Sequence, residues 1–343
     1  MKSRKQATIR DIAGALGVTP STVSRALHNH PNISDETKQA VNDCAEQMHY
    51  RQNVTASSLR TGKTKTIGVI VPRINSHFIS SAIAGIETVS KKAGYSIIIC
   101  QSNEMLEDET NAVRTLLSKR IDGMLASISM ETTHSEHFRE VIGMKTPLVF
   151  FDRVCTDLDV SSVTIDDFKG AYKATEHLVK QGCRRIVYFG GSTDLAIYRR
   201  RLDGYRQALN HHHIPIDENL IFTTNQMTDN MGSTLIETLY KNRHLPDGIC
   251  SSNDNLAAGA MKFLIEHRVK IPEQIAIIGF SNALFSQWMT PQLSTVDQHS
   301  ELMGSHAASL LLEEIRQTTV GCVPRNIVLH PELIIRGSSQ RRK

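Results

Sequence analysis

From Thr66 onward, short apolar runs alternate with stretches whose apolar residues recur at helical spacing. The runs before residue 160 are TIGVIV, YSIIIC, IDGMLAS and TPLVFFD, and those after it are SVTID, RRIVYFGG, LIFTT, DGICSS and IAIIGF. Short apolar runs bounded by turn residues are typical of buried strands, and their alternation with helices predicts parallel sheets covered on both faces. Two such series predict two doubly wound α/β lobes with a cleft between them.

Before residue 50 the pattern is purely helical. Thr8 is a predicted N-cap, Gly17 ends this first helix, and Thr19 followed by Pro20 begins a second one at once. Two helices joined around a glycine and braced by a third form a helix-turn-helix, whose second helix enters the major groove of DNA. The alternative is a three-helix module used for protein contacts.

The charge of the chain favours DNA as the partner of these helices. Residues 1–65 hold ten of the 39 Lys/Arg and five of the 35 Asp/Glu residues. The rest of the chain holds 29 Lys/Arg and 30 Asp/Glu. A basic excess confined to the first fifth of the chain indicates a negatively charged partner there. No signal peptide or apolar membrane segment is recognisable, and the six scattered cysteines are typical of reduced, cytoplasmic proteins. We therefore expect a cytoplasmic protein with no membrane contact.

The order of several sequence blocks resembles the LacI/GalR family of transcriptional repressors. The blocks are TIRDIAGALGVTPSTVSRAL, PNISDETKQAV, HYRQNVTASSLRTGKTKTIGVIVP, VTIDDFKGA, EHLVKQGCRRIVYFGG, RLDGYRQAL and SSNDNLAAGAM. The resemblance implies a homodimer whose paired heads bind palindromic double-stranded operator DNA. It also implies a periplasmic-binding-protein-like core that binds a sugar or sugar derivative as effector.

These observations predict the domain boundaries. We expect a helix-turn-helix DNA-binding domain over 1–52, a hinge helix and linker over 53–65, and a frayed tail over 338–343. The first lobe is expected over 66–162 and about 293–322, and the second over 163–292 and about 323–337.

The predicted DNA-binding residues lie at the start of the first helix, on the second helix and near its ends, and in the hinge. Short hydroxyls can bind phosphate or base edges without holding a helix away from the groove, and an arginine can bind a guanine with two hydrogen bonds. The resemblance implies that the segment around Leu59 becomes helical on operator DNA and that Leu59 wedges into the minor groove; packing of Leu59 on the core is the alternative. The full predicted set is Thr8, Thr19, Pro20, Ser21, Thr22, Ser24, Arg25, Asn29, Asn53, Ala56 and Leu59.

The predicted effector residues follow strands, because doubly wound folds bind ligands beyond the carboxyl ends of their strands. Carboxylates there can accept hydrogen bonds from sugar hydroxyls, an arginine can donate to them, and aromatic rings can stack on a sugar. A structural ion pair or a core aromatic is the alternative for each residue. The set is Phe78, Asp152, Arg153, Arg201, Asn253, Asp254 and Trp288.

No catalytic, cofactor or metal site is predicted. The segment TGKT at 61–64 lacks the preceding strand and glycine of a phosphate-binding loop, and the adjacent histidines at 211–213 do not share one helix face. The remaining alternatives are a sugar kinase with a fused DNA-binding head and a solute-binding receptor. The first would need a phosphate loop and metal-binding carboxylates, and the second a signal peptide.

Overall fold

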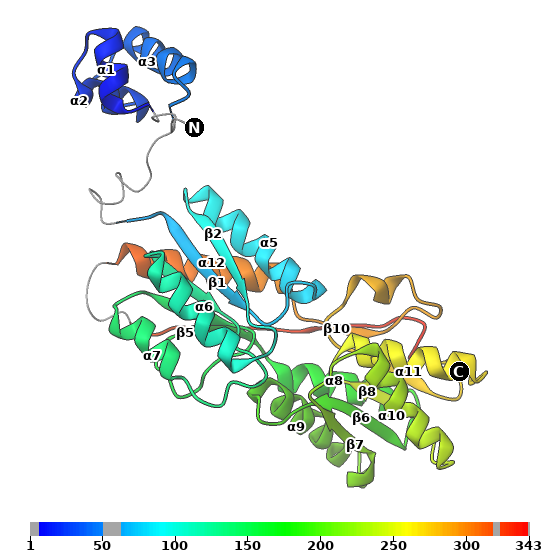
Figure 1. Cartoon of the computed structure of the whole chain (residues 1–343). Coiled ribbons are helices and arrows are strands. Elements are labelled where there is room, and N and C mark those ends of the chain that lie inside the picture. Colours follow the sequence, from blue (N-terminus) through cyan, green and yellow to red (C-terminus); the bar gives the residue numbers. More distant parts are fainter. Residues whose placement is uncertain (1–6, 51–62, 318–322, 342–343) are drawn as a thin grey trace, which may run out of the picture. The chain divides into compact units, whose positions relative to one another are not determined.

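The computed structural model describes residues 7–50, 63–317 and 323–341. The chain divides into two compact units, Met1–Thr64 and Lys65–Lys343, which are described separately below (Figure 1). No helix within the described ranges is long and apolar enough to cross a membrane.

The first unit contains the three predicted helices: α1 (Ile9–Leu16), α2 (Pro20–Leu27) and α3 (Asp35–Gln47). Thr8 caps α1 in a capping box with Asp11, and Thr19 caps α2 with Pro20 in its first turn, as predicted. Gly17 ends α1 with φ 67°, a left-handed conformation that glycine adopts without strain. The helices pack on a small apolar core made of Ile12, Ala13, Val23, Ala26, Val41 and Ala45.

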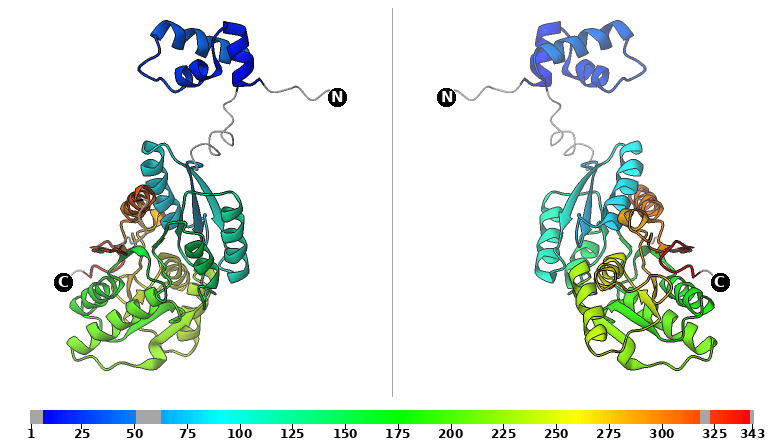
Figure 2. Two further views of the ribbon diagram at one scale, coloured as in Figure 1. Left: turned by 90° about the vertical axis from the view of Figure 1, so that its left-hand side faces the viewer. Right: turned by 90° about the vertical axis from the view of Figure 1, so that its right-hand side faces the viewer.

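The second unit begins with a six-stranded parallel sheet in the order β11-β5-β4-β3-β1-β2. Its strands are β1 (Thr66–Val71), β2 (Ser96–Gln101), β3 (Gly123–Ala126), β4 (Leu148–Phe151), β5 (Ser161–Ile165) and β11 (Asn326–Leu329). Helices α5 (His77–Lys92) and α12 (Ser300–Arg316) lie together on one face, and α6 (Leu106–Ser118) and α7 (Glu136–Gly143) lie on the other (Figure 2). The predicted doubly wound first lobe is therefore present.

The other lobe has a four-stranded parallel sheet in the order β7-β6-β8-β9. Its strands are β6 (Ile186–Gly191), β7 (Ile221–Thr224), β8 (Gly248–Ser251) and β9 (Ala276–Ile278). Helices α8 (Asp167–Lys180) and α9 (Ala196–His211) pack together, as do α10 (Asp229–Lys241) and α11 (Asp254–Glu266). Two short 3-10 helices, η1 (Glu218–Leu220) and η2 (Leu284–Gln287), lie in its loops.

Within the described ranges the chain crosses between the lobes three times, and the crossings differ from the predicted boundaries. β5 pairs with β4 and β11 in the first sheet. The predicted boundary at 163 is therefore wrong because it divides β5, and the assignment of 323–337 to the second lobe is wrong for β11. β10 (Thr295–Asp297) pairs instead with β12 (Glu332–Ile334), and Ser294 bridges to Ile278 of the second lobe. The prediction failed because alternation identifies strands but not the sheet in which a strand finds its partners.

The predicted frayed tail is also wrong for its first residues. Ser338 and Ser339 are fully buried. The Ser338 hydroxyl donates to the carbonyl of Ile277 at 2.7 Å and accepts from the backbone N–H of Ser294 at 2.8 Å. The polar composition suggested a loose end, but the Ser338 hydroxyl satisfies buried backbone groups beside β9, and the Ser339 hydroxyl donates to the Ser294 hydroxyl at 2.7 Å.

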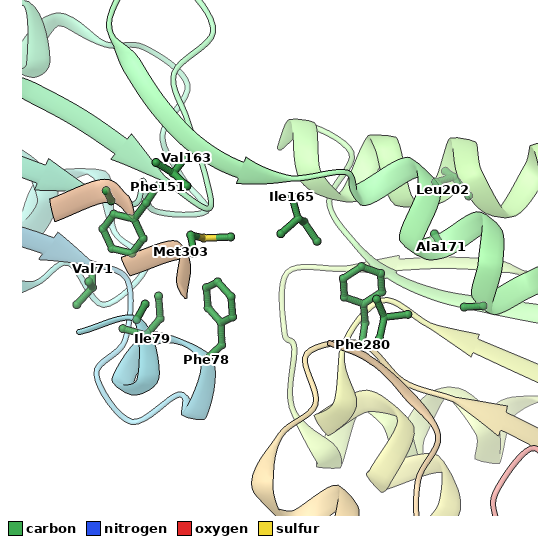
Figure 3. Packing of buried hydrophobic residues seen from close by; sticks show 14 of the residues in the cluster. Val71, Phe78, Ile79, Phe151, Val163, Ile165, Ala171, Leu202, Phe280 and Met303 are labelled. Carbon is green, nitrogen blue, oxygen red and sulfur yellow. The ribbon is translucent and has the colours of Figure 1, made fainter. Parts of the chain in front are cut away.

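One apolar core joins the two lobes across the crossings. Phe78, Phe151 and Met303 of the first lobe belong to the same cluster as Phe280 and Leu202 of the second, with Ile165 at the end of β5 lying between them (Figure 3). The residues that follow these strands therefore lie around the junction of the lobes, as the predicted effector site requires.

Candidate DNA-binding surface and effector site

The N-terminus of α2 carries a cluster of hydroxyl groups. The Thr19 hydroxyl accepts from the backbone N–H of Thr22 at 3.2 Å, and its oxygen lies 2.8 Å from the Ser21 hydroxyl and 2.9 Å from that of Thr22. Thr19, Pro20 and Ser21 are exposed, whereas Thr22 is half-buried. The N–H groups and exposed hydroxyls of a helix N-terminus are suited to contact phosphate oxygens.

The rest of the predicted face continues along α2. Arg25 is exposed in the last turn, and Ser24 is half-buried one residue earlier. Asn29 is exposed with φ 51°, and the N–H of His30 donates to the carbonyl of Arg25 at 3.0 Å, so Asn29 ends the helix in the left-handed conformation. Thr8 is exposed at the start of α1, with its hydroxyl bonded to Asp11. The three predicted hinge residues, Asn53, Ala56 and Leu59, lie outside the described residues.

In the second unit, Arg201 is a buried connector between two of the crossings from lobe to lobe. Its Nε donates to Asp167 at 2.7 Å, immediately after β5, and its Nη2 donates to Gln298 at 3.0 Å, between β10 and α12. Its Nη1 donates to the carbonyl of Ser252 at 2.8 Å, and the guanidinium carbon lies 3.8 Å from the centre of the Phe280 ring. The structural ion pair that we considered as the alternative for Arg201 is therefore present.

Burial shifts the pKa values of the groups in this cluster. Burial raises the pKa of Asp167 to about 6, an effect that outweighs the attraction of the Arg201 guanidinium. Burial of Arg201 disfavours its charged form, but its neighbours Asp167, Tyr198 and Asp152 together more than offset this effect and raise the pKa of the guanidinium. The neighbours of Arg201 thus stabilise its charged form, while burial favours the protonated form of Asp167.

Asp152 and Arg153 lie directly after β4, as predicted. Asp152 is buried with φ 61°, and its carboxylate accepts from the Ser127 hydroxyl at 3.3 Å. Burial raises its pKa, while Arg153 and Arg201 partly oppose the rise. Arg153 pairs with Glu104 at 2.7 Å and reaches the Tyr198 hydroxyl of α9 at 3.4 Å, so it connects the two lobes. A non-glycine residue held at positive φ beside such a cluster is typical of a functional site.

Asp254 and Asn253 make local structural contacts at the start of α11. The Asp254 carboxylate accepts from the Thr295 hydroxyl and from the Ala283 N–H, each at 2.7 Å, and burial raises its pKa to about 6. The Asn253 side chain caps the helix by accepting from the N–H groups of Asn255 and Leu256. Both carboxylate oxygens of Asp254 are therefore used in holding the loop after β9.

The two predicted aromatic residues lie in opposite environments. Phe78 is buried in the core that joins the lobes, close to Ile79 and Met303 in Figure 3. Trp288 is 72% exposed at the end of η2. Neither placement brings these rings beside the Arg201 guanidinium, which stacks on Phe280 instead.

Two of the seven predicted effector residues, Asp152 and Arg153, line a cavity of about 380 Å³. Asp167 also lines this cavity. It was not among the predicted effector residues, although it closely follows an apolar strand, as Asp152 does. Gln298 and Phe280 were missed as well. Phe280 could have been found as the aromatic residue after β9, whereas nothing in the local sequence marks Gln298.

Comparisons with known proteins agree with this arrangement. The family model for bacterial regulatory proteins of the lacI family matches residues 8–53, and a periplasmic binding protein-like domain matches residues 175–339. The HTH-type transcriptional repressor PurR of Vibrio atlanticus is 30% identical over 97% of this chain and 98% of its own length.

Two solved structures share the fold. The lac repressor dimer bound to operator and the anti-inducer ONPF has a TM-score of 0.87 at 23% identity. The match covers 98% of this chain and 100% of that chain. A periplasmic binding protein/LacI transcriptional regulator from Alkaliphilus metalliredigens, complexed with D-xylulofuranose, has a TM-score of 0.71 at 25% identity, over 81% of this chain and 100% of its own length. This chain belongs to the lacI family of bacterial regulatory proteins and is a DNA-binding transcriptional regulator.

Proposed function

We propose that this chain is a cytoplasmic, non-enzymatic repressor that binds a palindromic operator as a homodimer and is controlled by a sugar-like effector. The exposed face of α2 is the observation that carries the DNA-binding part. Thr19, Ser21 and Arg25 are exposed there, while Val23 and Ala26 on the other side form the head's core. The dimeric, operator-bound lac repressor supports the paired arrangement by its similar fold.

In this proposal, Arg25 reads a base and the hydroxyls of Thr8, Thr19, Ser21, Thr22 and Ser24 contact phosphates or base edges, with Pro20 and Asn29 shaping the ends of α2. The test is to select the sequences that the full chain binds from a pool of randomised duplex DNA. The selected sequences are expected to contain an inverted repeat. Arg25→Ala should then weaken binding by about 1–3 kcal/mol and relax the preference at one position per half-site. Arg10→Ala removes an exposed arginine from α1 and serves as a control for charge alone. Selection without an inverted repeat, or equal effects of both variants on sequence preference, would contradict the proposal.

The hinge part of the proposal concerns Asn53, Ala56 and Leu59. A short polar segment that folds only on DNA gains helix when the operator is added, and an apolar wedge contributes only where the duplex can kink. Leu59→Ala should therefore weaken operator binding while leaving weak binding to unrelated DNA unchanged. Equal loss on both DNAs would show that Leu59 has no wedge role.

For the effector, we propose that a sugar binds at the junction of the lobes, beside Asp152, Arg153 and Arg201. The connection of Arg201 to both Asp167 and Gln298 is the supporting observation, because a ligand that alters this cluster acts on two crossings at once. A ligand shifts a conformational equilibrium only through different affinities for its two states. The relative complexed with D-xylulofuranose supports a sugar as the ligand class.

The remaining predicted effector residues have smaller parts in this proposal. Asn253 and Asp254 already use their side-chain oxygens in contacts within the protein, so we assign them the shaping of the site, and Phe78 and Trp288 stay predictions. The test is operator affinity across a panel of sugars. Asp152→Asn should keep operator affinity and abolish the effect of the sugar, whereas Asp157→Asn, an exposed neighbour in the same loop, should change neither. A sugar that acts equally on both variants would place the effector site elsewhere.

A further inference from the structure

Four neighbouring strands of the first sheet begin at the same edge. β4, β3, β1 and β2 are parallel, and in each pair the two strands start within one residue of each other. With about 4.8 Å between neighbouring strands, their starting ends span about 15 Å. The chain that comes from the head enters the second unit at this edge, through Lys65 and β1. We define the entry edge as the four segments before these strands: 63–65, 91–95, 118–122 and 143–147.

The entry edge is strongly basic. Its four segments contain seven Lys/Arg and one Asp/Glu, whereas the chain beyond residue 65 holds nearly equal numbers of both. Lys65, Lys92, Lys119 and Lys145 are exposed there. The one acidic residue, Asp122, accepts a hydrogen bond from the backbone N–H of Lys65 at 3.0 Å. Such a concentration of cations attracts a polyanion to this edge.

Contacts around Tyr95 extend this basic surface to α12. The Lys65 ammonium lies 4.4 Å from the centre of the Tyr95 ring, a cation–π contact that holds the lysine beside β2. Burial raises the pKa of the Tyr95 hydroxyl, Asp122 adds to the rise, and Arg316 opposes it. Arg316, the last residue of α12, therefore lies near the same ring and adds a further cation.

Helix dipoles explain part of this pattern. Lys91 and Lys92 lie in the last turn of α5, where cations complement the partial negative charge of the helix end. The second lobe has the same feature, since Lys241 ends α10 and Lys270 follows α11. The dipoles therefore account for cations in both lobes. What distinguishes the entry edge is that the chain from the DNA-binding head arrives there.

The length of the connecting chain keeps this edge within reach of DNA. The 13 steps from Tyr50 to Lys63 span at most about 45 Å. A surface joined to a DNA-bound head by so short a chain meets the duplex at an effective concentration of about a millimolar. Phosphate contacts that are too weak to form alone then form. In contrast, β4 and β8 both end beside Arg201 at the lobe junction, so the strands of the second lobe begin at the opposite end of the unit.

We propose that the entry edge is a second DNA-binding surface of this protein, located on the core, which contacts the phosphates of the duplex that the head reads. Lysine ammonium groups bind phosphate oxygens without reading bases. The entry edge therefore adds the same factor to the affinity for operator and for unrelated DNA, and it leaves the sequence preference to α2. The proposal rests on DNA binding by the head and is independent of the effector.

Fluorescence anisotropy of the full chain on the selected operator and on an unrelated duplex tests this surface across a range of salt concentrations. The test variant carries Lys92→Gln, Lys119→Gln and Lys145→Gln, three exposed positions of the entry edge. It should bind both DNAs at least tenfold more weakly than the wild type. The slope of log affinity against log salt should fall by about 2 or more, because each phosphate contact contributes about 0.9. An unchanged slope, or a loss confined to the operator, would overturn the proposal.

A second variant controls for net charge. It carries Lys241→Gln, Lys262→Gln and Lys270→Gln, which remove the same charge from exposed positions of the second lobe. Its affinities should stay within threefold of the wild type, because at physiological salt charges act over only about 8 Å. Equal losses in both variants would show an effect of net charge alone and would overturn the assignment of the entry edge.

Acetylation of the wild-type lysines, read by mass spectrometry with and without operator, locates the contact and does not depend on the folding of any variant. Operator should slow the acetylation of Lys92, Lys119 and Lys145 at least threefold and leave Lys262 and Lys270 unchanged. Unchanged rates at the entry edge would overturn this proposal, even where the selected DNA contains an inverted repeat and the proposed function stands. Selection without an inverted repeat would contradict the proposed function instead, and protection of the entry edge on DNA would still support the surface.

Discussion

Replacing Arg201 by methionine should destabilise the second unit strongly, and more so at high pH. The side chains of Arg201 and Asp167 are 5% and 4% exposed, so the variant leaves a buried carboxylate without its partner. Removing one member of a buried ion pair costs about 3–5 kcal/mol. Adding Asp167→Asn to the variant should recover about 2 kcal/mol or more, because the uncompensated charge is then gone.

The pH dependence follows from the carboxyl pKa. Burial already raises the pKa of Asp167 to about 6 in the folded protein, from 3.8, and loss of Arg201 raises it further. A group whose folded pKa is raised contributes stability at low pH that is lost as pH rises through that pKa. The cost of Arg201→Met should therefore be larger at pH 8 than at pH 5, by about 1.4 kcal/mol for each further pKa unit.

Urea unfolding of the full chain, followed by circular dichroism, measures this cost. Arg200→Met is the matched control, because Arg200 is 59% exposed and lies 3.9 Å from Asp166. It should change the free energy of unfolding by less than about 0.5 kcal/mol. A cost of Arg201→Met below about 1 kcal/mol, or one equal at both pH values, would refute the assignment of Arg201 as the buried connector.

Three further predictions concern a cap, the C-terminal segment and a second carboxylate. Thr19→Ala should lower the stability of α2 by about 1 kcal/mol, seen as faster hydrogen exchange of its amides, and unchanged exchange would exclude the cap. Ser338→Ala should lower the free energy of unfolding by about 1–3 kcal/mol in urea, with the exposed Gln340→Ala as control, and equal effects would contradict the observed burial. Burial raises the pKa of Asp254 from 3.8 to about 6 in the folded protein. Between pH 7.5 and pH 5 the free energy of unfolding of the wild type should therefore rise by about 1.4 kcal/mol relative to that of Asp254→Asn. A difference that stays constant with pH would refute the raised pKa.

Much of the fold could be predicted from local patterns. The caps at Thr8 and Thr19 determine where α1 and α2 begin, and the strand-helix alternation identified β1 to β9. These features depend on residues that are close in sequence. β10, β11 and β12 were missed because they join strands that are far away in sequence, β12 for β10 and β5 for β11, and such a mutual fit has no local signal.

The candidate site was predicted less completely. Position after a strand correctly marked Asp152 and Arg153 as residues at the lobe junction. The same rule marked Asp254, whose carboxylate instead binds Thr295 and Ala283 of its own lobe. Hydrogen-bond partners depend on the packing of distant segments, so residue type and strand position do not distinguish a ligand-binding carboxylate from a structural one.

Insertion of five base pairs at the centre of the selected operator tests paired reading of DNA most directly. About ten base pairs complete one helical turn, so the insertion places the two half-sites on opposite sides of the duplex. Fluorescence anisotropy of the full chain on both DNAs gives the two affinities. If two copies of α2 read one inverted repeat, the insertion should weaken binding at least a hundredfold, towards the affinity for a single half-site. Affinities that agree within threefold would contradict a dimeric repressor.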